Sequence, residues 1–293
     1  YAMQRAVELT GIPLRINAPD DPAAAGQDPG MVDVLDINNL NPEDITVGEI
    51  SPTCGKAAME RVTKAGELAL AGVVDGMATA PLNKEAASLA GYESIGHSEL
   101  LQELAGVKTV ATMLLAKNLR VVHLTTHRSL RLACDYVKKD RILEFLQLTH
   151  DNFVTWGFKN PRIGAAALNP HNSDGGLLGS EEAEEIAPAV EAARQRGIDV
   201  TGPVPADIIF HQAIQGRYDA VLCMFHDQGH IPVKVYGFEE SITANLGLPF
   251  VRTSVDHGTA FDIAGKGIAD AFSMLESIRL AVGLAKGNGL ADF

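Results

Sequence analysis

Short apolar runs rich in β-branched residues alternate along the chain with longer amphipathic stretches. Runs of the first kind predict buried strands, and apolar residues repeated at helical spacing predict helices. The predicted strands are Val73–Ala78, Thr109–Leu115, Arg120–Thr125, Ile163–Leu168, Ala220–Met224 and Pro232–Tyr236. The predicted helices include Pro52–Ala71, Leu130–Phe153, Glu181–Arg196 and Ser273–Ala285. Strands that alternate with helices are typical of crossover units, so the pattern predicts an α/β fold with a mostly parallel sheet.

Two segments lack this periodicity and are predicted to be loops. Asn17–Asp33 is dense in Pro, Asp and Gly, which favours plain surface. Asn169–Gly179 follows a predicted strand, the place where α/β proteins usually bind ligands. Inside the helix predicted at Glu181–Arg196, Pro188 removes a backbone hydrogen bond, so we expect a kink or a restart there.

Composition narrows the class of protein. Of the 293 residues, 46% are hydrophobic, 5% are aromatic and 28 are glycine, a balance typical of α/β enzymes and unlike a disordered chain. The 24 basic and 37 acidic residues give a net charge of −13, which argues against a partner made of nucleic acid or acidic lipid. The three cysteines form no CxxC pair, so we expect a reducing compartment, the cytoplasm. The longest charge-free apolar run, around Val110–Ala116, is too short to predict a membrane span.

The usual phosphate-binding signatures are missing from the sequence. Neither G-x-G-x-x-G nor G-x-x-x-x-G-K-[ST] occurs. A Walker ATPase and a standard Rossmann dehydrogenase are therefore disfavoured, and the candidate chemistry has to come from other residues.

Histidines are the most prominent of these, because several of them follow predicted strands. His123 and His127 are four residues apart, but Leu124 replaces the Glu that the zinc motif H-E-x-x-H needs. The neighbouring valines and threonines favour a strand, in which four residues span about 13 Å, too far for two ligands of one ion. His127, at the exit of the strand, is therefore the candidate ligand, and His123 is expected to be packed in the interior.

Two more histidines occupy the same kind of position. His226 directly follows the predicted strand Ala220–Met224, with His230 as the spare, and His171 follows the strand Ile163–Leu168. Three imidazoles at strand ends on one sheet edge would bind a divalent ion and leave open positions for a substrate. The residues alone leave a second interpretation open, namely three unrelated polar strand ends.

Basic residues near these points favour an anionic ligand in an otherwise acidic chain. The cations are Lys84, Lys234 and Arg252, and His97 and Ser98 add an imidazole and a hydroxyl at the start of a helix. Each alone is most often an ordinary surface residue. Together they would bind a phosphate or a carboxylate.

Several segments, in order along nearly the whole chain, resemble the 4-hydroxythreonine-4-phosphate dehydrogenase (PdxA) family. They are Gly96-His97-Ser98-Glu99, Thr125-Thr126-His127, Leu168-Asn169-Pro170-His171, Phe225-His226-Asp227-Gln228-Gly229 and the long run Leu246–Ala260. The run His257–Gly267 is also similar to the adenosine-binding loop of isocitrate and isopropylmalate dehydrogenases. The resemblance implies their two-lobed α/β/α fold and an NAD cofactor held without a glycine-rich Rossmann turn, with NADP left open.

Residue by residue, the resemblance implies three kinds of contact. The metal ligands fall on His127, His171 and His226, and in the family this site is shared across a homodimer interface. The implied substrate contacts are His97, Ser98, Lys234, Thr243 and Arg252, with Ser98 in place of the usual Thr and Thr243 in place of the usual Asn. The implied cofactor contacts are His257, Gly258, Thr259, Ala260, Asp262 and Ile263. No residue is assigned as the general base.

The resemblance also implies a division into lobes. Residues 1–93 and 257–293 are expected to form the first lobe, on the cofactor side, and residues 94–256 the central lobe that binds metal and dimerises. The family opens with a further strand and a glycine-rich loop that are not in this sequence, so the first lobe is expected without that strand.

The implied reaction is the oxidation of a 4-phosphorylated β-hydroxy acid by NAD, followed by decarboxylation, with one divalent ion (Zn, Mg, Co or Mn) serving both steps. The acid is 4-phosphohydroxy-L-threonine, which belongs to pyridoxine biosynthesis, or 4-phospho-D-threonate or 4-phospho-D-erythronate. Ser98, His230 and Thr243 favour the sugar acids slightly. The alternatives are an aromatic cis-dihydrodiol carboxylate dehydrogenase of the same family, a metal-dependent hydrolase and a non-catalytic relative. The adenosine-type loop argues against a hydrolase.

Overall fold

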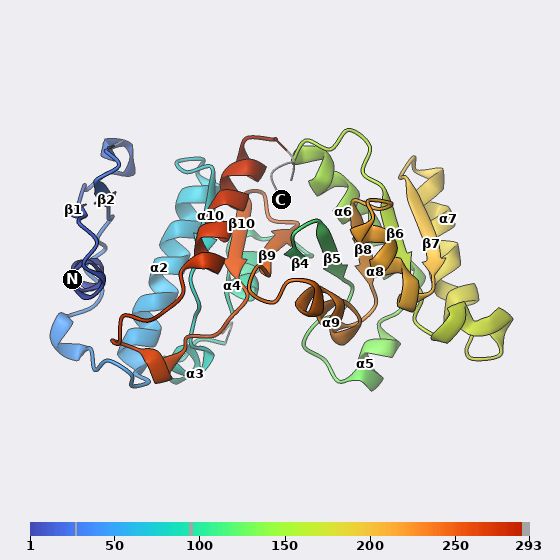
Figure 1. The fold of residues 1–293 in the computed structure, drawn as a ribbon, viewed down its shortest axis with the longest axis horizontal. Helices are drawn as coiled ribbons and strands as arrows, with labels where there is room; N and C mark the ends of the chain where they lie inside the picture. Colours follow the sequence, from blue (N-terminus) through green and yellow to red (C-terminus); the bar gives the residue numbers. More distant parts are fainter. Residues whose placement is uncertain (27, 94–95, 289–293) are drawn as a thin grey trace.

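The computed structural model describes residues 1–26, 28–93 and 96–288, and Figure 1 shows its fold. The strands are β1 (Arg15–Asn17), β2 (Met31–Asp33), β3 (Gly76–Thr79), β4 (Ala111–Ala116), β5 (Leu119–His123), β6 (Ile163–Ala166), β7 (Val200–Val204), β8 (Ala220–Cys223), β9 (Ile242–Leu246) and β10 (Val251–Val255). The α-helices are α1 (Ala2–Thr10), α2 (Pro52–Leu70), α3 (Lys84–Leu89), α4 (His97–Ala105), α5 (Leu130–Asp135), α6 (Lys139–Thr155), α7 (Ala187–Gln195), α8 (Ala206–Ile214), α9 (His226–Tyr236) and α10 (Phe272–Ala285).

Eight strands form one mixed sheet in the order β3-β10-β9-β4-β5-β8-β6-β7 (Figure 1). The strands β5, β8, β6 and β7 pair in parallel, as do β3 and β10. The three pairings between them, β10 with β9, β9 with β4 and β4 with β5, are antiparallel. The α/β prediction is confirmed, but the centre of the sheet is not parallel, because the short connections between β4 and β5 and between β9 and β10 make hairpins.

Helices cover both faces of the sheet, which makes the molecule three layers thick (Figure 1). The largest buried cluster packs α6, α7 and α10 against one face. The opposite face carries α8 and α9 in a second cluster and α2 and α4 in a third. Along β4, Met113 belongs to the first cluster and Leu114 to the second, as the alternation of side chains in a strand requires. This arrangement confirms the α/β/α layering predicted above.

The strand predicted at Pro232–Tyr236 is wrong, because these residues belong to α9. The alternating valines in this run mimic the period of a strand. In the structure the buried residues of α9 are Gly229 and Val233, which are four positions apart, and this is the period of a helix. Helix phase therefore decides the orientation of every side chain in this segment.

Other boundaries differ from the prediction in smaller ways. The helix predicted at Leu130–Phe153 is two helices, α5 and α6, because the backbone of Lys138 is extended. The helix predicted at Glu181–Arg196 begins with a π-helical turn, Glu182–Ile186, and restarts as α7 with Pro188 in its first turn, which confirms the expected interruption. The strands β1, β2, β7, β9 and β10 were not predicted, and β2 lies inside the segment Asn17–Asp33 that was predicted to be a loop. In β9 and β10 polar side chains interrupt the apolar pattern.

Within the described part of the chain, no helix combines the length and apolar character that a membrane crossing needs.

Candidate active site

The three strands that precede the predicted metal ligands are neighbours in the sheet. Because β5, β8 and β6 pair in parallel, their carboxyl ends lie at the same edge. His127 follows β5, His226 is the first residue of α9 after β8, and His171 follows β6. The topology therefore brings the three segments to one region, as the sequence predicted.

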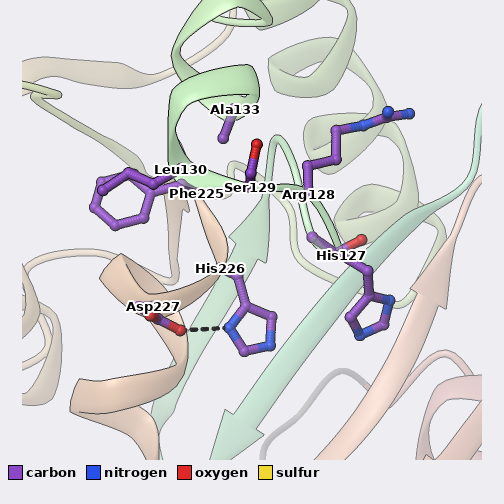
Figure 2. A pocket seen from close by; sticks show the side chains of 9 residues that line it. His127, Arg128, Ser129, Leu130, Ala133, Phe225, His226 and Asp227 are labelled. Atoms are coloured by element: carbon purple, nitrogen blue, oxygen red, sulfur yellow. Dashed lines mark hydrogen bonds and ion pairs between the residues drawn. The ribbon is translucent and has the colours of Figure 1, made fainter.

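His127 and His226 face each other across a cavity of about 360 Å³ (Figure 2). Their ring centroids are 5.8 Å apart. The Nδ1 atom of His226 lies 2.7 Å from Oδ1 of Asp227, so the carboxylate accepts the Nδ1 hydrogen and leaves Nε2 as the free donor of a lone pair. A histidine oriented by a carboxylate in this way is the usual form of a metal-ligating imidazole.

This pair fits the divalent ion that the family implies. With metal–nitrogen bonds of about 2.0–2.1 Å, two ring centres on one ion lie roughly 5–6 Å apart, which is the separation found between His127 and His226. Imidazole nitrogen is also a preferred ligand of zinc. The donor chemistry and the spacing of these two side chains thus agree with a shared metal ion.

His171 lies apart from this pair in the single chain. It is exposed on the loop after β6, and its backbone adopts a left-handed conformation with φ 53°. Among the described residues, no group of three His, Cys, Asp or Glu side chains is arranged to hold a metal. Because the implied site is shared between two subunits, His171 as a third ligand stays a prediction.

Two further histidines, the half-buried His230 and the buried His123, lie behind the pair His127 and His226. The ring of His230 stacks on that of His226 with centroids 3.6 Å apart, and His230 Nδ1 lies 3.0 Å from His123 Nε2. His123 is 1% exposed, and its Nδ1 lies 3.3 Å from the carbonyl oxygen of Thr112. The expectation that His123 is packed in the interior is therefore confirmed. His226 and His230 stack because they are one helical turn apart in α9.

A second cavity, of about 310 Å³, adjoins the pair His127 and His226 and shares Thr126 and His127 with the first. Most of the predicted substrate contacts line it. These are His97, Ser98, Thr243 and Arg252, together with Lys84 and His230. The structure thus brings together residues from five elements, α3, α4, α9, β9 and β10.

Arg252 is the buried cation of this second cavity. Its side chain comes from β10, and the residue is 5% exposed. Nη2 donates to Thr79 Oγ1 at 2.6 Å and Nη1 donates to Asn245 Oδ1 at 2.7 Å. Both acceptors are neutral, so the positive charge of the guanidinium is not cancelled by these bonds. Burial lowers the pKa of Arg252 to about 10, which leaves it protonated at neutral pH.

His97 and Ser98 open α4, whose positive end faces the same cavity. Burial, followed by the positive charges of Arg252 and Lys84, lowers the pKa of His97 to about 4. The imidazole is therefore neutral at physiological pH. A neutral histidine beside two cations is suited to hydrogen bonding with an anionic ligand that those cations attract.

Asn245 and Gln228 are site residues that the sequence analysis missed. Asn245 links two predicted contacts, because its Nδ2 also donates to Ser98 Oγ at 3.2 Å. Gln228 joins two strand ends, because its Nε2 donates to the carbonyl of Ala167 and its Oε1 accepts from the Met224 amide, each at 2.7 Å. Two features of the sequence could have pointed to them. Asn245 lies two positions after Thr243 in the same strand, so both side chains point to the same face of the sheet. Gln228 lies inside the motif Phe225–Gly229 that contains His226.

Lys234 differs from the other predicted substrate contacts. Its Nζ lies 2.5 Å from Oδ2 of Asp256 and donates to Ser241 Oγ at 2.8 Å. It lines a third cavity, of about 320 Å³, together with His257. Asp256 borders both this cavity and the second one. Lys234 therefore lies at the junction between the predicted substrate contacts and the predicted cofactor loop.

The six predicted cofactor contacts lie in the connection between β10 and α10. His257, Gly258, Ala260 and Asp262 are exposed, and Thr259 and Ile263 are half-buried. Ala260 has a left-handed backbone, with φ 46°, where the loop turns into a short 3-10 helix, Phe261–Ile263. The three cavities thus follow one another from the pair His127 and His226 to this loop.

Comparison with known proteins agrees with the motifs. Residues 1–281 match the family described as Pyridoxal phosphate biosynthetic protein PdxA. The chain is 44% identical over 288 residues to 4-hydroxythreonine-4-phosphate dehydrogenase of Geobacter metallireducens, covering 98% of this chain and 85% of the relative. It is also 44% identical over 284 residues to D-threonate 4-phosphate dehydrogenase of Cupriavidus necator, covering 97% and 85%.

The solved structures lead to the same result. The crystal structure of 4-hydroxythreonine-4-phosphate dehydrogenase from Klebsiella pneumoniae superposes with a TM-score of 0.89 at 43% identity, over 97% of this chain and 87% of that one. The fold is the α/β fold of these oxidoreductases, and the names of these relatives agree with a dehydrogenase that acts on a CH–OH group. The chain belongs to the PdxA family, as the motifs predicted.

Proposed function

We propose that this protein oxidises a 4-phosphorylated hydroxy acid with NAD and a divalent metal ion, and that the product then loses carbon dioxide. The buried Arg252 is the observation that carries the proposal. The guanidinium bonds the neutral oxygens of Thr79 and Asn245, and the cavity is also lined by Lys84 and by the positive end of α4. Two carboxylates, Glu99 and Asp256, line it as well, and Asp256 is paired with Lys234. The buried guanidinium, the ammonium and the helix end together offer an anionic ligand three positive partners.

The roles of the chain's own residues follow from their places. Arg252 and Lys84 bind the anionic groups, and the neutral His97 orients the substrate through a hydrogen bond. His127 and His226, with His171, are the residues that would hold the ion. When bound, the ion supplies Lewis-acid polarisation of the substrate hydroxyl, and the nicotinamide supplies the hydride acceptor.

The cofactor contacts and the dimer are further parts of the proposal. The loop from His257 to Ile263 would bind the adenosine end of NAD, and the adjoining third cavity would take the rest of the cofactor. A homodimer would complete the metal site with His171. The three cysteines are free, which agrees with a reducing compartment such as the cytoplasm.

The choice of acid is tested by a direct comparison. Purified protein is assayed for NADH formation with NAD, Zn²⁺, Co²⁺, Mg²⁺ or Mn²⁺, and either 4-phosphohydroxy-L-threonine or 4-phospho-D-threonate. We expect turnover of at least one acid, abolished by a chelator and restored by metal. Turnover of the first alone assigns the protein to pyridoxine synthesis, and turnover of the second alone assigns it to sugar-acid breakdown. The two relatives at equal identity do not separate these outcomes.

Two controls keep the test specific. The unphosphorylated acids are expected to react poorly, because they lack the group that Arg252 and Lys84 would bind. If neither acid reacts, an aromatic cis-dihydrodiol carboxylate is offered in the same assay, and turnover of that compound would replace the proposal. Hydrolysis of a phosphate ester without NAD would contradict it altogether.

A further inference from the structure

The loop that follows β6 has an unusual backbone. His171, Asn172, Ser173 and Asp174 have φ values of 53°, 58°, 67° and 44°, and Gly175 continues the series at 71°. This left-handed region is unfavourable for residues with a Cβ atom, because Cβ crowds the carbonyl oxygen that follows. Four such residues in succession therefore depend on contacts with the rest of the protein.

Glu182 bonds the entry to this segment and one of its four left-handed residues, Ser173. Its Oε1 accepts hydrogen bonds from the backbone amides of Leu168, at 2.8 Å, and Asn169, at 2.7 Å. Its Oε2 accepts from Asn169 Nδ2, at 2.9 Å, and from the hydroxyl of Ser173. The bonded residues lie on both sides of His171, so one carboxylate fixes the entry to the left-handed segment and its middle.

The carboxylate of Glu182 is buried against the His171 loop. Glu182 is 4% exposed, although a glutamate is rarely buried unless it is paired. Burial by itself raises the pKa of Glu182, but the hydrogen bonds from Asn169 and Ser173 outweigh it, so the pKa lies below its usual value. The charge is stabilised mainly by donors on the His171 loop and its approach, and the backbone of Glu182 itself adds a further hydrogen bond.

The helix that carries Glu182 is irregular at the point of contact with the loop. Glu182 begins the π-helical turn Glu182–Ile186, an irregularity that is frequent at functional sites. Its neighbour Glu181 accepts a further hydrogen bond from Asn169 Nδ2 at 2.7 Å. The local helix geometry therefore directs two acidic side chains at the loop.

We propose that Glu182 is a positioning residue, whose carboxylate holds the left-handed loop in one conformation and so determines where the His171 imidazole lies for metal binding. The inference rests on the proposed function, which makes His171 a ligand. Glu182 itself touches neither metal nor substrate. It acts through the backbone, as the partners of metal ligands do.

The test compares variants that differ in this one contact. Glu182→Gln keeps the size of the side chain but turns an accepting oxygen into a donor, and Glu182→Ala removes it. Glu184→Gln is the matched control, because Glu184 lies in the same π-helical turn and is exposed. His171→Ala shows what loss of the imidazole itself does.

Two measurements are made on each full-length variant. Amide hydrogen exchange of residues 168–178 is followed in metal-free protein, and Co²⁺ affinity is measured by competition with a chromogenic chelator, with the visible spectrum of the Co²⁺ form recorded. We expect Glu182→Gln to speed exchange in this loop, to weaken Co²⁺ binding about 10- to 100-fold and to change the Co²⁺ spectrum. Glu184→Gln is expected to do none of these. If Glu182→Ala does not fold, the results for Glu182→Gln alone decide whether Glu182 positions His171.

The outcomes separate this inference from the proposed function. Unchanged exchange in Glu182→Gln overturns the inference. The inference is also overturned if Glu182→Gln speeds exchange but leaves Co²⁺ affinity unchanged while His171→Ala weakens Co²⁺ binding. In that case the metal site of the proposed function still stands. If His171→Ala leaves Co²⁺ affinity unchanged, His171 is not a ligand, and that part of the proposed function fails together with the positioning role.

Discussion

His230 donates a hydrogen bond from Nδ1 to Nε2 of His123, over 3.0 Å. The direction follows from Thr112, whose carbonyl only accepts, so that the Nδ1 atom of a neutral His123 carries the hydrogen. Burial and the neighbouring histidines lower the pKa of His123 to about 3 and that of His230 to about 4, which keeps both neutral. The Nε2 atom of His230 is then an acceptor at the second cavity, which His230 lines.

The first prediction removes this buried partner. His123→Leu breaks two hydrogen bonds at once: the carbonyl of Thr112 loses the imidazole donor, and Nδ1 of His230 keeps only the carbonyl oxygen of His226, at 3.2 Å. We expect the free energy of unfolding to fall by about 1–3 kcal/mol in urea denaturation at neutral pH. His211→Leu, on the exposed face of α8, should change it by less than about 0.5 kcal/mol. Equal effects in the two variants would contradict the assigned network.

The second prediction concerns the buried cation. Arg252→Lys keeps the charge but loses the planar fork that bonds Thr79 and Asn245. We expect the KM of the phosphorylated acid to rise roughly 10- to 100-fold, the equivalent of about 1.5–3 kcal/mol for a hydrogen bond to a charged group. Steady-state kinetics measures this. Arg217→Lys, at an exposed turn before β8, serves as the control. An unchanged KM would remove Arg252 from the substrate site.

The third prediction concerns the carboxylate behind His226. Asp227→Ala frees the His226 ring to rotate, because it removes the acceptor of the Nδ1 hydrogen. We expect Zn²⁺ affinity, measured by competition with a chelator, to fall about 10- to 100-fold. Asp227→Asn keeps an accepting oxygen without the charge, so its loss should be smaller. Asp207→Ala in the first turn of α8 is the control. Full affinity in Asp227→Ala would show that His226 needs no such partner.

The fourth prediction is a dependence of stability on pH. The pKa of His97 is about 4 in the folded protein because burial, Arg252 and Lys84 disfavour its charged form, whereas the ordinary value is 6.5. Between these values the unfolded chain binds a proton that the folded chain does not. The free energy of unfolding therefore falls as the pH decreases through this window, by at most about 1.4 kcal/mol per pH unit from this group.

Two variants isolate the contribution of His97. Urea denaturation of His97→Asn between about pH 7.5 and pH 4.5 should give a flatter pH dependence than the parent protein. His211→Asn, an exposed change on α8, should leave the slope as it was. A slope that is the same in His97→Asn would mean that this imidazole takes up a proton equally well in both states.

Local pattern in the sequence carried much of the correct prediction. His127, His171 and His226 each follow an apolar strand directly in the chain, so their positions at strand ends depend on neighbours a few residues away. The α/β class and the interruption at Pro188 also follow from local periodicity and backbone chemistry. The PdxA motifs are contiguous segments for the same reason, and the family match confirms them.

The tertiary structure decided what depends on distant contacts. Thr79 and Arg252 are 173 positions apart in the chain, and Ser98 and Asn245 are 147 apart, so no local pattern reveals that they bond. The segment at Pro232–Tyr236 shows the same limit, because a short apolar run fits a strand or a helix until its packing is known. Glu182 reads as one of several acidic residues at a helix start. Only the folded chain, by burying it against the left-handed loop, makes it the residue that holds His171 in place.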